Sequence, residues 1–233
     1  MPIDPETTSL LAFADQLWRQ SDGLFDITSG VLRRVWDFRA ACVPAADAVA
    51  QAVAQIGWPR VQRTAEAVAL PDAGMELDFG GFGKEYAADR AAALLERDGA
   101  TSGIVNLGGD LRVLGPRPDG SAWSIGIQHP RAPERAIASI RLARGALATS
   151  GDYERFFEVD GKRYCHILNP ATGWPVQGWQ SISVVAPLCV AAGAMSTIAL
   201  LHEDAAPAFL AGQQVAWLGV DRNGDVIRHG LPV

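Results

Sequence analysis

The sequence predicts a mixed α+β fold in which a central antiparallel sheet is flanked by helices. Three observations support this prediction. Short apolar runs typical of strands fill the middle of the chain, glycine-containing turns join them as hairpins, and four segments repeat apolar residues at helical spacing. There is no internal repeat and no Pro/Ser-rich linker, so we expect residues 1–233 to form a single domain.

The first helix has the clearest boundaries. Asp4, Pro5 and Glu6 supply a cap, a first-turn proline and an acid that the helix dipole favours, and Ser21-Asp22-Gly23 ends the helix. Three further helices are predicted from the spacing of their apolar residues: from about Ala45 to Gly57, from the glycines Gly80–Gly83 to Gly99, and Cys189–Leu201.

The strands are short, and several of the turns between them are recognisable. Gly108-Gly109, Asp160-Gly161 and Asn223-Gly224 are typical hairpin turns. The expected strands are Val61–Thr64, Ala67–Leu70, Met75–Asp78, Gly103–Leu107, Leu111–Leu114, Trp123–Ile127, Ile137–Leu142, Ala146–Thr149, Phe156–Val159, Arg163–Leu168 and Ser181–Ala186.

Composition excludes several functional classes. A net charge of −6 leaves no basic face for nonspecific nucleic-acid binding. Three widely spaced cysteines fit neither a zinc site nor a disulfide framework. No apolar run is long enough for a membrane span, and the start of the chain shows no export signal. We therefore expect a cytoplasmic protein by default, or a periplasmic one if a longer precursor exists.

The segment from Asp78 to Tyr86, DFGGFGKEY, has the chemistry of a phosphate site. Its glycines let the backbone approach an anion, the following helix offers N–H groups and a positive dipole, and Lys84 adds a full charge. Two familiar nucleotide motifs do not match, because Walker A requires Ser or Thr at Glu85 and the dinucleotide fingerprint requires glycine at Tyr86. A glycine turn that only packs a helix against a strand is the alternative.

Three other segments carry polar groups that could serve a site. Asn106 interrupts the apolar run Gly103–Asp110, where the alternative is an Asx-type turn that its own side chains stabilise. His166 precedes an Asn-Pro turn and could act as a base near neutral pH, or could simply close that turn. Thr149-Ser150-Gly151 lacks the elbow of a serine hydrolase, and the small residues of Gly193–Thr197 alone indicate only close helix packing.

Taken together and in this order, these segments resemble the ApbE family, the FAD:protein FMN transferases. The resemblance covers essentially the whole chain. It rests on five blocks: Gly23–Leu32, Asp78–Ala92, Ile104–Gly115, Ala146–Val176 and Leu188–Leu201.

The resemblance implies an ApbE/T-fold-like fold and a specific reaction. FAD would be held by its pyrophosphate together with Mg2+, and its FMN half would be transferred to a Thr or Ser hydroxyl of a target flavoprotein with release of AMP. Metal and cationic groups suit phosphoryl transfer, because they neutralise the oxygens while the reactants are aligned.

The resemblance also implies roles for individual residues. The turn Gly81, Phe82, Gly83 and Lys84 would hold the phosphates, and His166 would be the base for the acceptor hydroxyl. The Gly83 carbonyl and the Thr197 hydroxyl would be metal ligands. Further residues would line the flavin or acceptor side: Asn106, Gly108, Asp110, Thr149 and Asp152.

Two departures from the family pattern stand out. Family members usually have an aspartate metal ligand where this chain has Gly193, and many have glycine where it has Glu85. We hypothesise that Glu85 supplies the missing carboxylate; the alternative is a first-turn acid favoured by the helix dipole. Members also usually carry a segment before the Gly23–Leu32 block that helps to cover the flavin, and we expect this chain to lack it.

Two other functions remain open from the sequence. Water could replace the protein hydroxyl as the acceptor, which would make the chain an FAD pyrophosphatase. Gly193 and the expected lack of the preceding segment would also suit a non-catalytic FAD-binding relative. The acceptor protein and the oligomeric state are not encoded in any motif.

Overall fold

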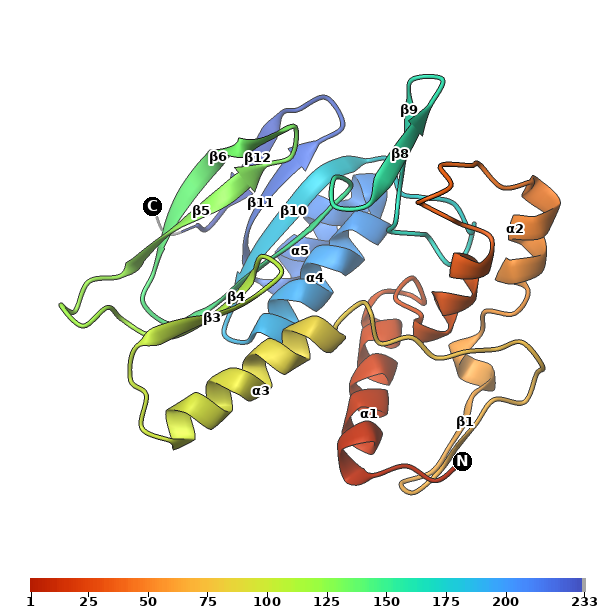
Figure 1. Cartoon of the computed structure of the whole chain (residues 1–233), viewed down its shortest axis with the longest axis horizontal. Helices are drawn as coiled ribbons and strands as arrows, with labels where there is room; N and C mark the ends of the chain where they lie inside the picture. The colour runs from red at the N-terminus through yellow and green to blue at the C-terminus, as the bar shows by residue number, and fades with distance from the viewer. Residues whose placement is uncertain (232–233) are drawn as a thin grey trace. The chain divides into compact units, whose positions relative to one another are not determined.

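The computed structural model describes residues 1–231, which contacts divide into two compact units (Figure 1). The first unit comprises Met1–Phe79 and Arg155–Val176, and the second comprises Gly80–Glu154 and the chain from Gln177 onward. Each unit is therefore assembled from segments that are separated in the sequence. The single-domain organisation expected from the sequence stays a prediction.

The second unit is built on a six-stranded antiparallel sheet with the strand order β12-β11-β10-β7-β4-β3. This sheet confirms the predicted fold class. Its strands are β3 (Gly103–Leu107), β4 (Asp110–Gly115), β7 (Gly145–Gly151), β10 (Trp179–Ala186), β11 (Ala216–Asp221) and β12 (Val226–His229).

Helices cover one face of this sheet. α3 (Gly83–Arg97) packs on β3 and β4, and α4 (Cys189–Leu201) packs on β7 and β10 as well as on α3 (Figure 1). α5 (Ala206–Gln213) packs in turn on α4. Because side chains alternate along a strand, Ala146 faces the helices with Ala88 and Cys189, whereas Leu147 points to the opposite face.

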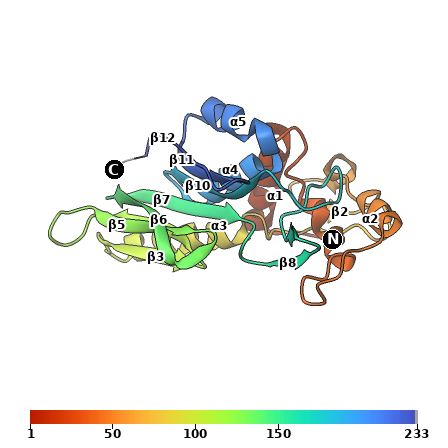
Figure 2. The same cartoon turned by 90° about the horizontal axis from the view of Figure 1, so that it is seen from above.

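A hairpin of β5 (Trp123–His129) and β6 (Ala132–Leu142) packs against that opposite face of the sheet. Figure 2 shows this hairpin on the other side of the sheet from α4 and α5. The contact is apolar: Ile125, Ile127 and Ile140 pack against residues of the sheet such as Leu147 and Leu218. The sheet is thus buried on both faces, which explains the continuous burial of β10.

The first unit contains two α-helices and two small hairpins. α1 (Pro5–Gln20) begins as predicted, with Asp4 Oδ1 accepting a hydrogen bond from Thr7 N at 2.8 Å. The other elements are η1 (Ile27–Arg34), α2 (Ala46–Val53), η2 (Trp58–Arg60), β1 (Gln62–Arg63), β2 (Val68–Ala69), β8 (Phe156–Val159) and β9 (Lys162–Cys165). An aromatic cluster of Trp36, Phe157, Tyr164 and Trp174 ties β8 and β9 to η1 and the segment that follows it.

Three predicted boundaries were wrong. Met75–Asp78 forms no strand, since Glu76 and Asp78 pair with Arg33 and the segment is held by these side chains. The second helix ends at Val53 and not at Gly57, and its last residues form tight turns. The strand expected at Arg163–Leu168 ends at Cys165. η1 and α5 were not predicted, because neither carries a regular apolar stripe.

Candidate functional site

The glycine turn leads directly into α3. Phe82 is the N-cap residue of this helix and is fully buried, so its ring anchors the turn. Among residues 1–231 no side chain accepts a capping hydrogen bond at this end of the helix. The first-turn N–H groups of Gly83, Lys84 and Glu85 therefore form the kind of anion site that phosphate occupies at helix N-termini.

Lys84 is oriented by Asp110 at the start of β4. Its Nζ lies 2.7 Å from Asp110 Oδ2, and the lysine side chain is 45% exposed whereas the aspartate is buried. Partial burial lowers the pKa of Lys84, but the hydrogen bond and charge of Asp110 outweigh it and raise the pKa above its ordinary value. Lys84 is thus a fixed positive charge with a solvent-facing side at the glycine turn.

The turn between β3 and β4 places Asp110. Gly108 and Gly109 adopt positive φ angles of 60° and 92°, and Asn106 Oδ1 accepts a hydrogen bond from Gly109 N at 3.0 Å. Asn106 therefore stabilises its own turn, which is the alternative considered from the sequence. Asp110 Oδ1 accepts a second hydrogen bond, from Thr149 N of β7 at 3.0 Å, so the aspartate links two strands of the sheet and Lys84.

Glu85 is buried between α3 and α4. A Cβ atom placed on Gly193 of α4 would lie 2.5 Å from Glu85 Cγ and 2.9 Å from Cδ, so the glutamate fills the space beside this glycine. Its Oε2 atom is buried and has no hydrogen-bond partner among the described residues. Burial, and then the hydrogen bond to Asp110, raise the pKa of Glu85 well above its ordinary value.

A group of hydroxyls lies one helical turn beyond Gly193. Ser150 Oγ of β7 is 2.8 Å from both Ser196 Oγ and Thr197 Oγ1 of α4, and Ser196 Oγ donates to the Gly193 carbonyl at 2.9 Å. Thr149 Oγ1 is 2.8 Å from Ser183 Oγ on the neighbouring strand β10. The Thr197 hydroxyl is therefore held in place by Ser150, on the helix that carries Gly193.

Asp152 is neutralised by an arginine. Arg131 Nη1 and Nη2 each donate to one carboxylate oxygen of Asp152 at 2.6 Å, a bidentate pair. The backbone N–H of Asp152 donates to the Gln180 carbonyl at 3.0 Å. Asp152 is thus fixed at the end of β7 in the second unit.

His166 lies in the first unit, directly after β9. Its backbone N–H donates to the Arg155 carbonyl at 3.0 Å, and its side chain is half-buried. The turn after it is closed by its own residues: Gly173 N donates to the Asn169 carbonyl at 2.7 Å, and Asn169 Oδ1 accepts from Ala171 N at 2.9 Å. The turn thus closes through Asn169, without the His166 imidazole in these bonds.

The structure gathers the predicted residues of the second unit on the helix-covered face and the adjacent strand ends: the glycine turn, Lys84, Glu85, Asp110, Thr149 and Thr197. Within residues 1–231 no three His, Cys, Asp or Glu side chains form a cluster able to hold a metal by themselves. No described helix is long and apolar enough to cross a membrane.

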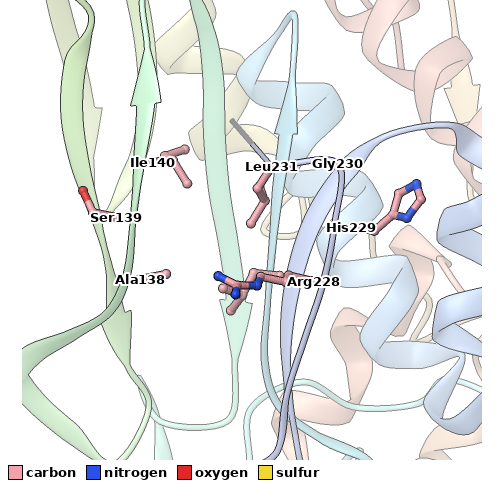
Figure 3. Close-up of a pocket in the computed structure, with 8 residues that line it drawn as sticks. Ala138, Ser139, Ile140, Arg228, His229, Gly230 and Leu231 are labelled. Carbon is pink, nitrogen blue, oxygen red and sulfur yellow. The ribbon is translucent and has the colours of Figure 1, made fainter. Parts of the chain in front are cut away.

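A pocket of about 360 Å³ lies elsewhere in the second unit. Figure 3 shows Ala138, Ser139 and Ile140 of β6 on one side and the segment Arg228–Leu231 on the other. None of the residues predicted for the site lines this pocket. The candidate site is therefore the glycine turn with its neighbours.

Comparison with known proteins identifies the family. A model of the ApbE family matches residues 1–218. This chain belongs to the ApbE family. Among solved structures, the ApbE protein from Thermotoga maritima is 34% identical with a TM-score of 0.89, covering 97% of this chain and 76% of that one. The apo form of the flavinyl transferase ApbE from Pseudomonas stutzeri is 29% identical with a TM-score of 0.84, covering 100% of this chain and 74% of that one.

Relatives in the ApbE family with a curated name are called FAD:protein FMN transferase. The protein from Klebsiella pneumoniae (strain 342) is 31% identical over 208 residues, which cover 84% of this chain and 59% of the relative. The protein from Haemophilus influenzae is 32% identical over 218 residues, which cover 88% of this chain and 62% of the relative. The chain thus spans about 60% of the length of these relatives.

Sequence reasoning missed two residues of this ApbE site. Ser150 was considered only as a hydrolase nucleophile, although it contacts Thr197, and Arg131 was not considered although it pairs with Asp152. Both contacts join segments that are distant in the sequence. A lone serine or arginine in the sequence carries no signal of such a partner.

Proposed function

We propose that this chain transfers the FMN half of FAD to a Thr or Ser hydroxyl of a target flavoprotein and releases AMP. The observation that carries the proposal is the uncapped start of α3 beside the Lys84–Asp110 ion pair. A helix N-terminus with an adjacent fixed lysine is suited to a pyrophosphate, and the relatives' name, FAD:protein FMN transferase, supplies the substrate. We place the other predicted residues, Asn106, Gly108, Asp110, Thr149 and Asp152, beside the flavin or the acceptor.

Mg2+ is part of the proposal, and the residues present fit it. Mg2+ prefers oxygen ligands and is usually bound by one or two carboxylates together with substrate phosphates. The buried Oε2 of Glu85 is such an oxygen without a protein partner among residues 1–231. We assign the Glu85 carboxylate, the Gly83 carbonyl and the Thr197 hydroxyl as the groups that would hold the metal. When bound there, the metal supplies positive charge to the pyrophosphate oxygens.

The chain's own groups carry the remaining steps. Lys84 and the first-turn N–H groups of α3 hold the pyrophosphate and stabilise the charge that develops during transfer. The acceptor oxygen bonds to the phosphorus of the FMN half, and the bond from that phosphorus to the bridging oxygen breaks. AMP leaves with that oxygen and its electron pair. His166 takes the proton of the acceptor hydroxyl.

Incubating the protein with FAD, Mg2+ and a target flavoprotein domain tests the function. Transfer gives a fluorescent flavin that stays with the denatured target in a gel, together with one AMP for each flavin attached. Free FMN and AMP in equal amounts, with no labelled target, would show a pyrophosphatase instead. Bound but unchanged FAD, in Mg2+ and in Mn2+, would show a non-catalytic flavin binder.

A further inference from the structure

We propose that Glu85 and Gly193 form a reciprocal pair, in which α3 rather than α4 supplies the carboxylate for the divalent cation. The inference rests on the proposed function, because it concerns the metal used in transfer. It goes beyond assigning Glu85 as a ligand, because it states that the two positions must change together.

The steric evidence comes from the contact between the two helices. A Cβ on Gly193 would meet Glu85 Cγ at 2.5 Å, and its Cδ and Oε1 atoms at 2.9 Å. Real side chains essentially never approach so closely, so Glu85 can occupy this place only while residue 193 has no side chain. Any larger residue at 193 must displace the Glu85 carboxyl.

The chemical evidence is the state of the carboxyl itself. Glu85 is 7% exposed, and its Oε2 has no hydrogen-bond partner in the described part of the chain. Burying a carboxyl oxygen without a partner costs free energy, so a glutamate that only filled space would be a poor choice here. The cost is offset if the oxygen binds a cation.

The surroundings suit a cation that also contacts phosphate. Glu85 follows Lys84 at the start of α3, its carboxyl contacts Asp110, and Thr197 lies one turn beyond Gly193 on α4. The carboxyl therefore lies between the phosphate-binding turn and the hydroxyl that we assign as a metal ligand. A carboxylate carried by residue 193 would start from the same place, on the facing helix.

Manganese binding tests whether Glu85 is a ligand. Mn2+ is titrated into the full chain and free Mn2+ is measured by electron paramagnetic resonance, with and without saturating FAD and with no acceptor present. Glu85→Gln keeps the shape of the side chain but removes the charge, and we expect at least a roughly tenfold loss of Mn2+ affinity. Glu96→Gln, the same change on an outer face of α3, should bind Mn2+ like the parent.

The double exchange Glu85→Gly with Gly193→Asp tests the reciprocity. It should recover Mn2+ affinity lost in Glu85→Gly, and it should unfold at a higher temperature than Gly193→Asp alone, in which two side chains compete for one space. A double variant that is no more stable than Gly193→Asp, or that binds Mn2+ no better than Glu85→Gly, would overturn the pairing.

The outcomes separate this inference from the proposed function. If the parent labels its target but Glu85→Gln has unchanged Mn2+ affinity, Glu85 only fills space and the inference fails alone. If the parent binds Mn2+ through Glu85 but leaves the target unlabelled, the cation site stands and the proposed transfer fails.

Discussion

Lys84 and His166 are assigned different tasks, and single substitutions can separate them. Lys84 belongs to the second unit and holds phosphate, whereas His166 belongs to the first unit and takes a proton from the acceptor. The binding of FAD and the chemistry of transfer should therefore be lost independently.

His166→Ala should abolish most of the transfer while leaving the affinity for FAD unchanged. A positioned base typically contributes about 10²- to 10⁴-fold to a rate, and the imidazole has no role in binding FAD in this account. The rate of target labelling and the dissociation constant of FAD measure the two effects. His229→Ala, at the exposed end of β12, is the control and should label the target at the parent's rate. Parental labelling by His166→Ala would remove His166 from the mechanism.

Among the helices, α4 depends on an aspartate from its neighbour. Asp89 of α3 accepts hydrogen bonds from Cys189 N and Val190 N, each at 2.9 Å, and pairs with the buried Arg112 at 3.2 Å. The aspartate thus replaces a cap from within the helix and joins α3, α4 and β4. This arrangement fixes the two helices that carry Glu85 and Gly193.

Asp89→Ala should destabilise the protein by about 3 kcal/mol, because it removes the cap and leaves the Arg112 charge buried without its partner. Urea unfolding gives the free energy. Asp98→Ala at the exposed end of α3 should cost less than about 0.5 kcal/mol. A loss of under 1 kcal/mol for Asp89→Ala would show that the helices are held mainly by apolar packing.

The turn after His166 depends on a glycine. Gly173 has a φ of 74°, and a Cβ there would overlap Val49 and Val53. Gly161 in the β8–β9 turn has nearly the same φ, 73°, but open space around it. The two glycines therefore share the backbone cost of a side chain and differ in the steric cost.

Gly161→Ala should cost about 1 to 2 kcal/mol from backbone strain alone. Gly173→Ala should cost about 1 to 3 kcal/mol more, because overpacking is added to the same strain. The free energies of unfolding, measured side by side, check the difference. Equal values for the two variants would mean that the residues around Gly173 move aside freely.

The sequence predicted the elements whose signals are local. α1 has its cap and proline in adjacent residues, α4 is one apolar run, and Asp160-Gly161 forms the expected hairpin. The segment Met75–Asp78 was mistaken for a strand because its alternating pattern is satisfied by ion pairs to Arg33 and not by a neighbouring strand. Long-range pairing decides such cases, and one sequence does not contain it.

The site was predictable to a similar degree. The glycine turn and Lys84 are contiguous, so their chemistry could be inferred from spacing. That Gly193 lies against Glu85, and that Ser150 holds Thr197, depends on how α4 packs on α3 and β7. The family resemblance indicated both positions of the Glu85–Gly193 pair, but only the folded structure shows that they share one space.

At the level of the whole molecule, the chain passes between the two units at Phe79–Gly80, Glu154–Arg155 and Val176–Gln177. The residues assigned to phosphate and metal belong to the second unit, and the assigned base belongs to the first. The account therefore predicts that the phosphate-binding turn is the foundation of the activity, since nothing can be transferred unless FAD is held there.

Isothermal titration of FAD into the protein, with and without Mg2+, tests this claim most directly. The account predicts measurable binding by the parent, at least a roughly tenfold weaker dissociation constant for Lys84→Ala, and parental binding for Lys162→Ala on the exposed β8–β9 turn. Absence of FAD binding by the parent under both conditions, or equal binding by Lys84→Ala, would contradict the account.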